Sequence, residues 1–486
     1  MSDSKKSAMG DFQTPPPLAL RVCQFLSARG HRPATVIEPT CGKGHLLAAA
    51  RSVFGQVALV GFDINSAHLA EATSLLPAAR LTRRDFFDVD WREALTGLEG
   101  PRLVLGNPPW VTVSKLSRLG ISNRPTAGKN PGLKGIDALT GQSNFDISQW
   151  MLLELLKALD GREATIALLL KTSVVRKTLE RLESAASHVH VEGLWTLDAR
   201  KDFGVSVNAG LFIVRTGGAQ GSYDCPIHEG LAGAPLRTMG VRDGALVADV
   251  NAWALAAPLL DKGSGRRWRS GLKHDCARIF ELTRRGDHLI NGLGEAVDVE
   301  PEYLYPLLKS TALAGREVEE TDRCVVVPQR RVGEDTSTLE ARAPRLFSYL
   351  SSHREALSAR ASRVYRGKPD FSIFGVGDYT FSLWKVAISG LHKRIHFRPV
   401  GPIDGRPAVF DDTCYLLPCA DEAEARQLAG LLNGARSVWL ALVFYDAKRP
   451  ITRRVLERVC LDSLIRAGAK PAEVRPQGGP LVDTEA

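Results

Sequence analysis

The chain has 486 residues, of which 44% are hydrophobic and 24% are charged, a composition ordinary for globular proteins and sufficient for a buried core. No run approaches the roughly 18 apolar residues of a membrane helix, and residues 1–10 lack the apolar centre of a secretory signal, so we expect a cytoplasmic protein. The formal net charge of +9 is compatible with a polyanionic partner and equally with a solvated basic surface.

Eight cysteines are spread along the chain, without a Cys-x-x-Cys pair or a Cys/His cluster of zinc-like spacing. We therefore expect reduced thiols that are mostly packed inside the protein, and no metal site. The length favours two or three domains.

Thr14 and the three prolines that follow it run into an apolar stretch that ends at Leu26. This pattern predicts an N-capped helix with proline in its first turn. Such helix starts are common, so a plain structural role is the alternative to a ligand contact.

A strand over residues 34–37, a glycine-containing turn and a helix over residues 46–53 predict the first unit of a nucleotide-binding α/β sheet. Gly42 and Gly44 would let the backbone approach a ligand closely. The turn matches neither the Walker loop nor the dinucleotide Gly-x-Gly-x-x-Gly. Because it carries one acid, Glu38, it suits a ligand that has an amine and no pyrophosphate.

The next two predicted strands, over residues 57–63 and 79–82, each lead to an acid. Asp63 follows the glycine turn at the spacing where an acid commonly accepts hydrogen bonds from ribose hydroxyls. Its alternative role is the N-cap of a helix over residues 66–75. Asp85 follows the third strand, where it could meet an adenine amine.

The fourth predicted strand, over residues 102–105, runs into Asn107-Pro108-Pro109-Trp110. Two prolines make a stiff turn that presents one side-chain amide, free carbonyls and an indole face. The Asn107 oxygen and a neighbouring carbonyl could each accept one hydrogen bond from an NH₂ group, and the indole offers a flat surface. The motif therefore predicts a site for the exocyclic amine of a nucleobase. A strand-ending turn with a packed tryptophan is the alternative.

Four successive strand ends thus carry polar side chains that could share one crevice, since ligands bind beyond the carboxyl ends of strands in open α/β sheets. Further apolar runs predict a fifth, sixth and seventh strand at residues 164–170, 189–197 and 209–214. Helices are expected at residues 145–159 and 172–182.

Two basic stretches are candidates for contacts with nucleic acid. The aperiodic segment 111–144 would place five cations beside the Asn107 turn: Lys115, Arg118, Arg124, Lys129 and Lys134. A solvated insertion is the alternative for this segment. A second stretch, residues 262–273, resembles a loop that contacts a nucleic-acid backbone through Arg266, Arg267, Arg269 and Lys273.

The alternation of strands and helices stops near residue 220, where we place a domain boundary. This gives a first domain over residues 1–220, a second over residues 221–466 and a flexible tail over residues 467–486.

Taken together and in this order, the motifs resemble the gamma class of DNA amino-methyltransferases, the Taq-type adenine-N6 enzymes. The matching residues are Gln13-Thr14-Pro15-Pro16, Glu38-Pro39-Thr40-Cys41-Gly42-Lys43-Gly44, Asp63, Asp85-Phe86, Asn107-Pro108-Pro109-Trp110 and Phe203. Three later blocks look like parts of the target-recognition domains of such enzymes: residues 268–275, 374–379 and 411–416.

The resemblance implies a seven-stranded, mostly parallel, Rossmann-like methyltransferase sheet, followed by a mixed α/β target-recognition domain. It implies S-adenosylmethionine as cofactor, with Thr14 against its methionine part, Glu38 and the glycine turn at its amino group, Asp63 at the ribose, and Asp85 with Phe86 at the adenine. The cofactor residues carried over are Thr14, Glu38, Pro39, Gly42, Gly44, Asp63, Ile64, Asp85, Phe86 and Asn107.

The catalytic residues carried over are Asn107, Pro108, Pro109, Trp110 and Phe203. The implied acceptor is an adenine flipped out of double-stranded DNA and stacked on Trp110, with Phe203 meeting the base edge-on. A cytoplasmic, nucleoid-associated enzyme without a fused nuclease is expected, with restriction or defence-system proteins as partners and with neither a membrane nor a metal. The alternatives are an RNA adenine or a protein glutamine as acceptor, or a recognition subunit without activity.

Overall fold

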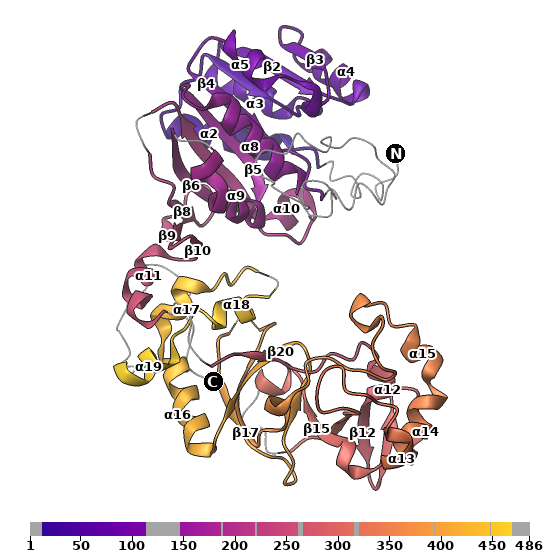
Figure 1. Ribbon diagram of the computed structural model, residues 1–486. Coiled ribbons are helices and arrows are strands. Elements are labelled where there is room, and N and C mark those ends of the chain that lie inside the picture. Colours follow the sequence, from indigo (N-terminus) through magenta and orange to yellow (C-terminus); the bar gives the residue numbers. More distant parts are fainter. Residues whose placement is uncertain are drawn as a thin grey trace. The chain divides into compact units, whose positions relative to one another are not determined.

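The structure is a computed structural model that describes residues 12–112, 146–185, 188–218, 221–260, 266–314, 320–392, 394–447 and 449–468. The described residues fall into two compact units, the first ending at Val250 and the second beginning at Asn251 (Figure 1). The boundary predicted after residue 220 is therefore too early. It fails because three strands that follow it extend the sheet of the first unit.

The first unit is built on a ten-stranded sheet in the order β10-β9-β8-β6-β7-β5-β4-β1-β2-β3. Neighbouring strands from β3 through β5 are parallel, and β7 lies antiparallel between β5 and β6. The seven predicted strands are β1 Thr35–Glu38, β2 Ala58–Asp63, β3 Arg80–Arg83, β4 Arg102–Gly106, β5 Ala164–Lys171, β6 Val189–Leu197 and β7 Ala209–Thr216.

The predicted count of seven strands is wrong, because a hairpin-like extension adds three. These strands are β8 Cys225–His228, β9 Pro235–Arg242 and β10 Ala245–Val247. Strand β8 pairs in parallel with β6, and β9 and β10 follow with antiparallel pairing. The first unit has an α/β fold, as predicted, and its sheet is parallel from β5 to β3, the half that carries the predicted site residues.

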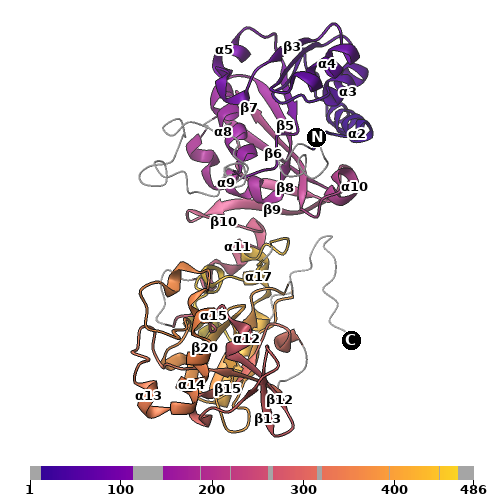
Figure 2. The ribbon, with the colours of Figure 1, turned by 90° about the vertical axis from the view of Figure 1, so that its right-hand side faces the viewer.

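The helices of the first unit are α2 Pro16–Ala28, α3 His45–Phe54, α4 Ser66–Leu75, α5 Trp91–Thr96, α8 Ile147–Leu159, α9 Thr172–Ala185 and α10 Ala199–Phe203. Helices α2 and α3 contribute apolar side chains to one core with β1, β4, β5 and β7. Helices α8 and α9 lie side by side in both ribbon views (Figure 1 and Figure 2). Helix α2 has prolines in its first turn, but Pro15 is its N-cap and no side chain caps it, so the predicted capping by Thr14 is wrong.

The second unit contains two sheets and several short helices. The first sheet joins, in order, β11 Arg269–Ser270, β20 Cys414–Cys419, β17 Trp384–Ser389 and β18 Arg398–Val400. The second joins β14 Ala296–Val297, β13 His288–Asn291, β12 Glu281–Arg285, β16 Arg323–Val326, β15 Leu304–Leu308 and β19 Val409–Phe410. The helices are α11 Val250–Ala256, α12 Ala277–Phe280, α13 Leu339–Arg342, α14 Pro344–Ser352, α15 Arg354–Ser358, α16 Glu422–Gly434, α17 Arg436–Leu442, α18 Arg453–Leu456 and α19 Leu461–Ala467.

The three sequence blocks singled out in this unit meet at one place. Arg269 pairs with Leu416 between β11 and β20, and a parallel bridge joins Leu272 to Asp411. An antiparallel bridge joins Lys273 to Phe374. Backbone pairing thus brings three chain segments together: residues 268–275, 374–379 and 411–416.

The helices within the described ranges are all too short or too polar to cross a lipid bilayer. All eight cysteines are free, and seven of them are buried, as the sequence predicts.

Candidate active site

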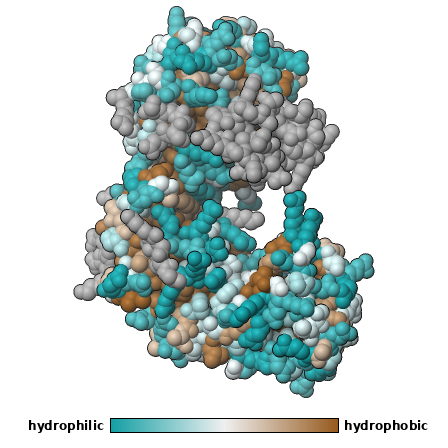
Figure 3. Space-filling view, in the orientation of Figure 1, coloured by the Kyte–Doolittle hydropathy of each residue, from teal (hydrophilic) through white to brown (hydrophobic). Residues whose placement is uncertain are grey.

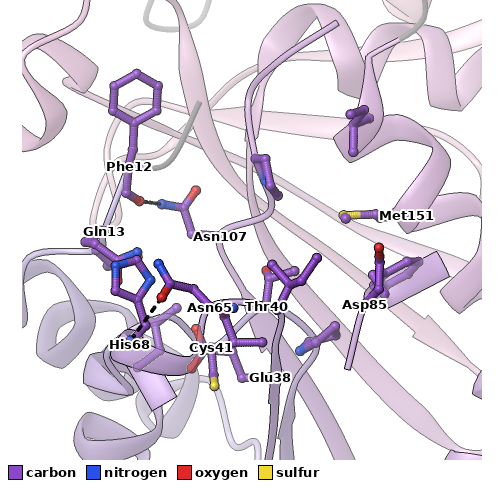
Figure 4. A pocket seen from close by; sticks show the side chains of 18 of the residues that line it. Phe12, Gln13, Glu38, Thr40, Cys41, Asn65, His68, Asp85, Asn107 and Met151 are labelled. Atoms are coloured by element: carbon purple, nitrogen blue, oxygen red, sulfur yellow. Dashed lines mark hydrogen bonds between the residues drawn. The ribbon is translucent and has the colours of Figure 1, made fainter. Parts of the chain in front are cut away.

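A cavity of about 250 Å³ opens at the carboxyl ends of the parallel strands of the first unit (Figure 4). The strand order β4-β1-β2-β3 places Asn107, Glu38, Asp63 and Asp85 in a row along this edge. Nine of the predicted site residues line the cavity: Thr14, Glu38, Pro39, Asp63, Ile64, Asp85, Phe86, Asn107 and Pro109.

Five predicted residues do not line the cavity, namely Gly42, Gly44, Pro108, Trp110 and Phe203. Gly42 and Gly44 have φ angles of +49° and +80°, so both adopt the left-handed conformation that favours glycine. Their role in the structure is therefore to shape the turn. Pro108 is buried directly behind Asn107.

Asn107 has one half of its side-chain amide fixed and the other half unpaired. Its Nδ2 donates a hydrogen bond of 2.7 Å to the Phe12 carbonyl, as Figure 4 shows. Its Oδ1 is buried and has no hydrogen-bond partner within the described ranges. A buried acceptor without a partner costs free energy, on the order of 1–3 kcal/mol. A donor on a bound ligand or substrate would remove that cost.

Glu38 is the second buried acceptor at the cavity. It is 3% exposed, and its Oε2 has no hydrogen-bond partner among the described residues. Burial, reinforced by the nearby charge of Asp63, raises the pKa of Glu38 well above its usual value, although a hydrogen bond from the Leu47 backbone opposes this. No positive side chain in the described part of the chain offsets this shift, and an ammonium ion would do so.

Asp63 holds the glycine turn in place. Its Oδ2 accepts a hydrogen bond of 2.8 Å from the Gly42 backbone, and its Oδ1 accepts one of 2.7 Å from the Asn65 backbone. The alternative that Asp63 caps the following helix is wrong, because Asn65 is the N-cap of α4 and accepts from the backbones of Ala67 and His68. Each carboxylate oxygen of Asp63 retains a second lone pair for a ligand hydroxyl.

Asp85 lies on the side of the cavity away from Phe12 and Gln13 (Figure 4), and Phe86 also lines the cavity. Asp85 caps the 3₁₀ helix η1 Phe86–Asp88 by accepting from the Phe87 backbone at 3.0 Å. The Phe86 ring is buried against the Trp91 ring, with centroids 4.6 Å apart. Ile64 is 51% exposed where it lines the cavity, so it offers an apolar surface to a ligand ring.

Trp110 is part of the hydrophobic core of the first unit and is 8% exposed. Its Nε1 donates to the Leu169 carbonyl at 3.1 Å. Phe203 meets its ring edge-on at 5.1 Å, and Phe12 lies tilted at 5.9 Å. The two rings predicted to hold a flipped base thus contact each other directly, and in this conformation the indole presents little surface to a base.

The contacts that hold the site together were not predicted, although Gln13 belongs to a motif that was noted. Phe12 and Gln13 line the cavity and contact the Asn107 turn and the glycine turn. Lys171, at the end of β5, forms an ion pair with Asp146 and donates to the Trp110 carbonyl at 3.5 Å. An Arg or Lys after an apolar strand is too common for sequence alone to single it out.

The predicted nucleic-acid contacts have mixed outcomes. Segment 113–145, which holds Lys115, Arg118, Arg124, Lys129 and Lys134, lies outside the described residues. Arg266 pairs with Glu424, and Lys273 pairs with Asp275 at 2.8 Å. Arg267 is exposed, and the Arg269 guanidinium lies 5.0 Å from the centre of the Tyr379 ring.

Across the described part of the chain, no group of His, Cys, Asp and Glu side chains could hold a metal ion. No protein-family model matches the chain.

Two similarities to known proteins are informative. The type IIL restriction–modification enzyme MmeI, solved in complex with DNA, matches with a TM-score of 0.54 at 13% identity, over 92% of this chain and 64% of that chain, a likeness of fold. The type II methyltransferase M.NspV of Nostoc sp. (strain ATCC 29411 / PCC 7524) is 39% identical over 472 residues, which are 96% of this chain and 98% of that protein. Identity at this level over nearly the whole of both chains shows that this protein belongs to the type II methyltransferases.

Proposed function

We propose that this type II methyltransferase acts on double-stranded DNA and methylates the N6 amine of an adenine, within a restriction–modification or phage-defence system. The observation that carries the proposal is the Asn107 amide, whose buried Oδ1 lacks a partner at the edge of the cavity. An exocyclic NH₂ group supplies the donor that this oxygen lacks.

S-adenosylmethionine is the cofactor of the chain, and the residues of the cavity fit it. Glu38, with its unpaired Oε2, would hold the ammonium group, and Asp63 would accept from the ribose hydroxyls. Ile64, Asp85 and Phe86 would hold the adenine ring. When bound, the cofactor supplies a methyl group on a positively charged sulfur.

The chemistry assigned to the chain is positioning and electrostatic stabilisation. The N6 amine is a poor nucleophile because its lone pair is delocalised into the ring. Asn107 Oδ1 and the Pro108 carbonyl would each accept one of its N–H groups, which favours a pyramidal nitrogen. The nitrogen gains the methyl group and then loses one proton to water, so no strong general base is needed.

The acceptor adenine must leave the duplex to reach this site. Trp110 is the ring on which the flipped base would stack, with Phe203 at its edge. Because Trp110 is 8% exposed, stacking requires that its ring first become accessible.

The second unit would provide the contacts with the DNA backbone. A cavity of about 500 Å³ is lined by four basic side chains at alternate positions of the sequence, His392, Arg394, His396 and Arg398. Its other described lining residues are small or apolar, Leu313, Ala314 and Ser389, and none is acidic. The intervening Ile395 and Phe397 pack into a hydrophobic core. Burial, with the positive charges of Arg398 and Arg394, lowers the pKa of His396. An anion such as a phosphate would relieve this concentration of positive charge. The face of this unit drawn in Figure 3 is largely hydrophilic, consistent with such a contact.

We expect Arg394→Ala to weaken DNA binding equally for all sequences and to reduce the slope of log affinity against log salt by about one, as for the loss of one phosphate contact. The measurement is a fluorescence-anisotropy titration at several salt concentrations. The matched control is Arg426→Ala, which removes an exposed arginine of the same unit that pairs with Glu422 within α16. If both variants keep the wild-type slope, the basic cavity does not hold a phosphate.

The proposed acceptor is tested by offering DNA, RNA and protein substrates in parallel with a labelled methyl donor. We expect label in duplex DNA, and in N6-methyladenine after digestion to nucleosides. Label in RNA adenine or in a glutamine side chain would replace DNA by that acceptor. No label in any of them would indicate a recognition subunit without activity.

A further inference from the structure

Residues 12–14, which we call the N-terminal strap, precede Pro15, the N-cap of helix α2, and each contacts a different element of the site. The Phe12 carbonyl accepts from Asn107 Nδ2 at 2.7 Å. Gln13 Oε1 accepts from the Lys43 backbone in the glycine turn at 3.1 Å. The Thr14 carbonyl lies 2.9 Å from His45 Nδ1 at the start of α3. One short segment thus joins the catalytic turn to the cofactor turn.

We propose that Gln13 is a positioning residue: it clamps the strap onto the glycine turn and thereby keeps the Phe12 carbonyl where it orients the Asn107 amide. This inference rests on the role of Asn107 proposed above. In it, Gln13 takes no part in the chemistry and acts only by holding the strap in position.

The Phe12 carbonyl decides which way the Asn107 amide points. A carbonyl oxygen can only accept, so the NH₂ end of the amide must face Phe12. The oxygen end is therefore the end left without a partner. In the flipped amide, Asn107 Oδ1 would face the Phe12 carbonyl oxygen, and neither oxygen could donate a hydrogen bond. The Asn107 NH₂ group would then face the substrate amine, and two donors would meet without an acceptor. Only the observed orientation serves an amine substrate.

Gln13 occupies the space above the glycine turn. A Cβ atom built on Gly42 would lie 2.2 Å from Gln13 Oε1 and 2.8 Å from Gln13 Nε2. The absence of a side chain at Gly42 therefore makes room for Gln13. Gln13 also lines the cavity, so the same side chain borders the cofactor site.

The first test compares Gln13→Ala with Gln13→Glu. Alanine removes the acceptor for the Lys43 N–H, so we expect kcat to fall about threefold to tenfold, the range of one neutral hydrogen bond, while the KM for DNA stays within twofold. Glutamate keeps an acceptor at the same position and should restore most of kcat. The matched control is Gln56→Ala, at an exposed glutamine after α3 that accepts only from Arg51 in the described hydrogen bonds.

The second test is a double-mutant cycle. Gly42→Ala should displace Gln13 and lower kcat, with an added contribution from the left-handed φ of this residue. In the Gln13→Ala background the clash is absent, so the second substitution should cost less than it does alone. Strictly multiplicative effects would overturn the proposed contact.

The third measurement does not depend on methylation. In the chain labelled with ¹⁵N-asparagine, the Asn107 side-chain amide should exchange slowly with water in the wild type and faster in Gln13→Ala, with recovery in Gln13→Glu. Unchanged exchange together with unchanged kcat in Gln13→Ala would overturn the proposal. Failure of the wild type to methylate DNA would overturn the proposed function alone, because the amide exchange would still report on the strap.

Discussion

We expect the variant Asn107→Ala to lose methyl transfer, with kcat reduced by at least about two orders of magnitude, the size seen when one preorganised hydrogen-bonding group is removed from a reacting centre. The loss is expected because the alanine removes the acceptor Oδ1 that faces the substrate amine. Cofactor binding should stay within a few fold, since Glu38 and Asp63 still line the cavity. Single-turnover methylation and calorimetric titration of the cofactor measure the two effects separately.

A graded control separates the two ends of the amide. Asn107→Asp keeps an oxygen acceptor but cannot donate to the Phe12 carbonyl, which lies 2.7 Å from Nδ2 in the wild type. We expect its activity to fall between that of the wild type and that of Asn107→Ala. Full activity in Asn107→Ala would show that the amide does not act on the substrate, and a parallel loss of cofactor affinity would show that it belongs to the cofactor site.

The local pattern of the sequence predicted the strands and the polar residues at their ends. Each of the seven predicted strands lies within two residues of its predicted bounds. The central strands β1, β4 and β5 are apolar runs because they are buried on both faces. The row of Asn107, Glu38, Asp63 and Asp85 follows from parallel pairing, which brings like ends of strands together.

Contacts between segments distant in the chain could not be predicted. Strands β8 and β9 have little apolar signal of their own, and they join the sheet because β8 pairs with the edge at β6 and β9 pairs with β8. The burial of Trp110 depends on Phe203 and on Leu169, which lie far along the chain. Gln13 accepts from the Lys43 backbone 30 residues along the chain, and a glutamine carries no pattern that indicates such a partner.

The free energy of unfolding should depend on pH through Glu38. Burial raises the pKa of Glu38, so the folded protein without cofactor binds a proton that the unfolded chain releases at about pH 4.3. Between that pH and the raised pKa, the free energy of unfolding should fall as pH rises, by at most about 1.4 kcal/mol per pH unit. In Glu38→Gln this slope should be absent, because glutamine does not titrate. Urea unfolding of both proteins across a pH series measures it.

The cofactor should reverse this dependence. An ammonium group beside Glu38 favours the carboxylate, so binding would release a proton and the affinity would rise with pH up to the raised pKa, by as much as about tenfold per unit. Glu38→Gln should bind the cofactor about tenfold to a hundredfold more weakly, the range of a charged hydrogen bond, and with no such rise. Calorimetry in buffers of different ionisation enthalpy counts the proton directly. If wild-type binding releases no proton and Glu38→Gln retains full affinity, then the ammonium group lies elsewhere, and the unpaired Oε2 of Glu38 is a structural cost of the buried turn rather than part of the cofactor site.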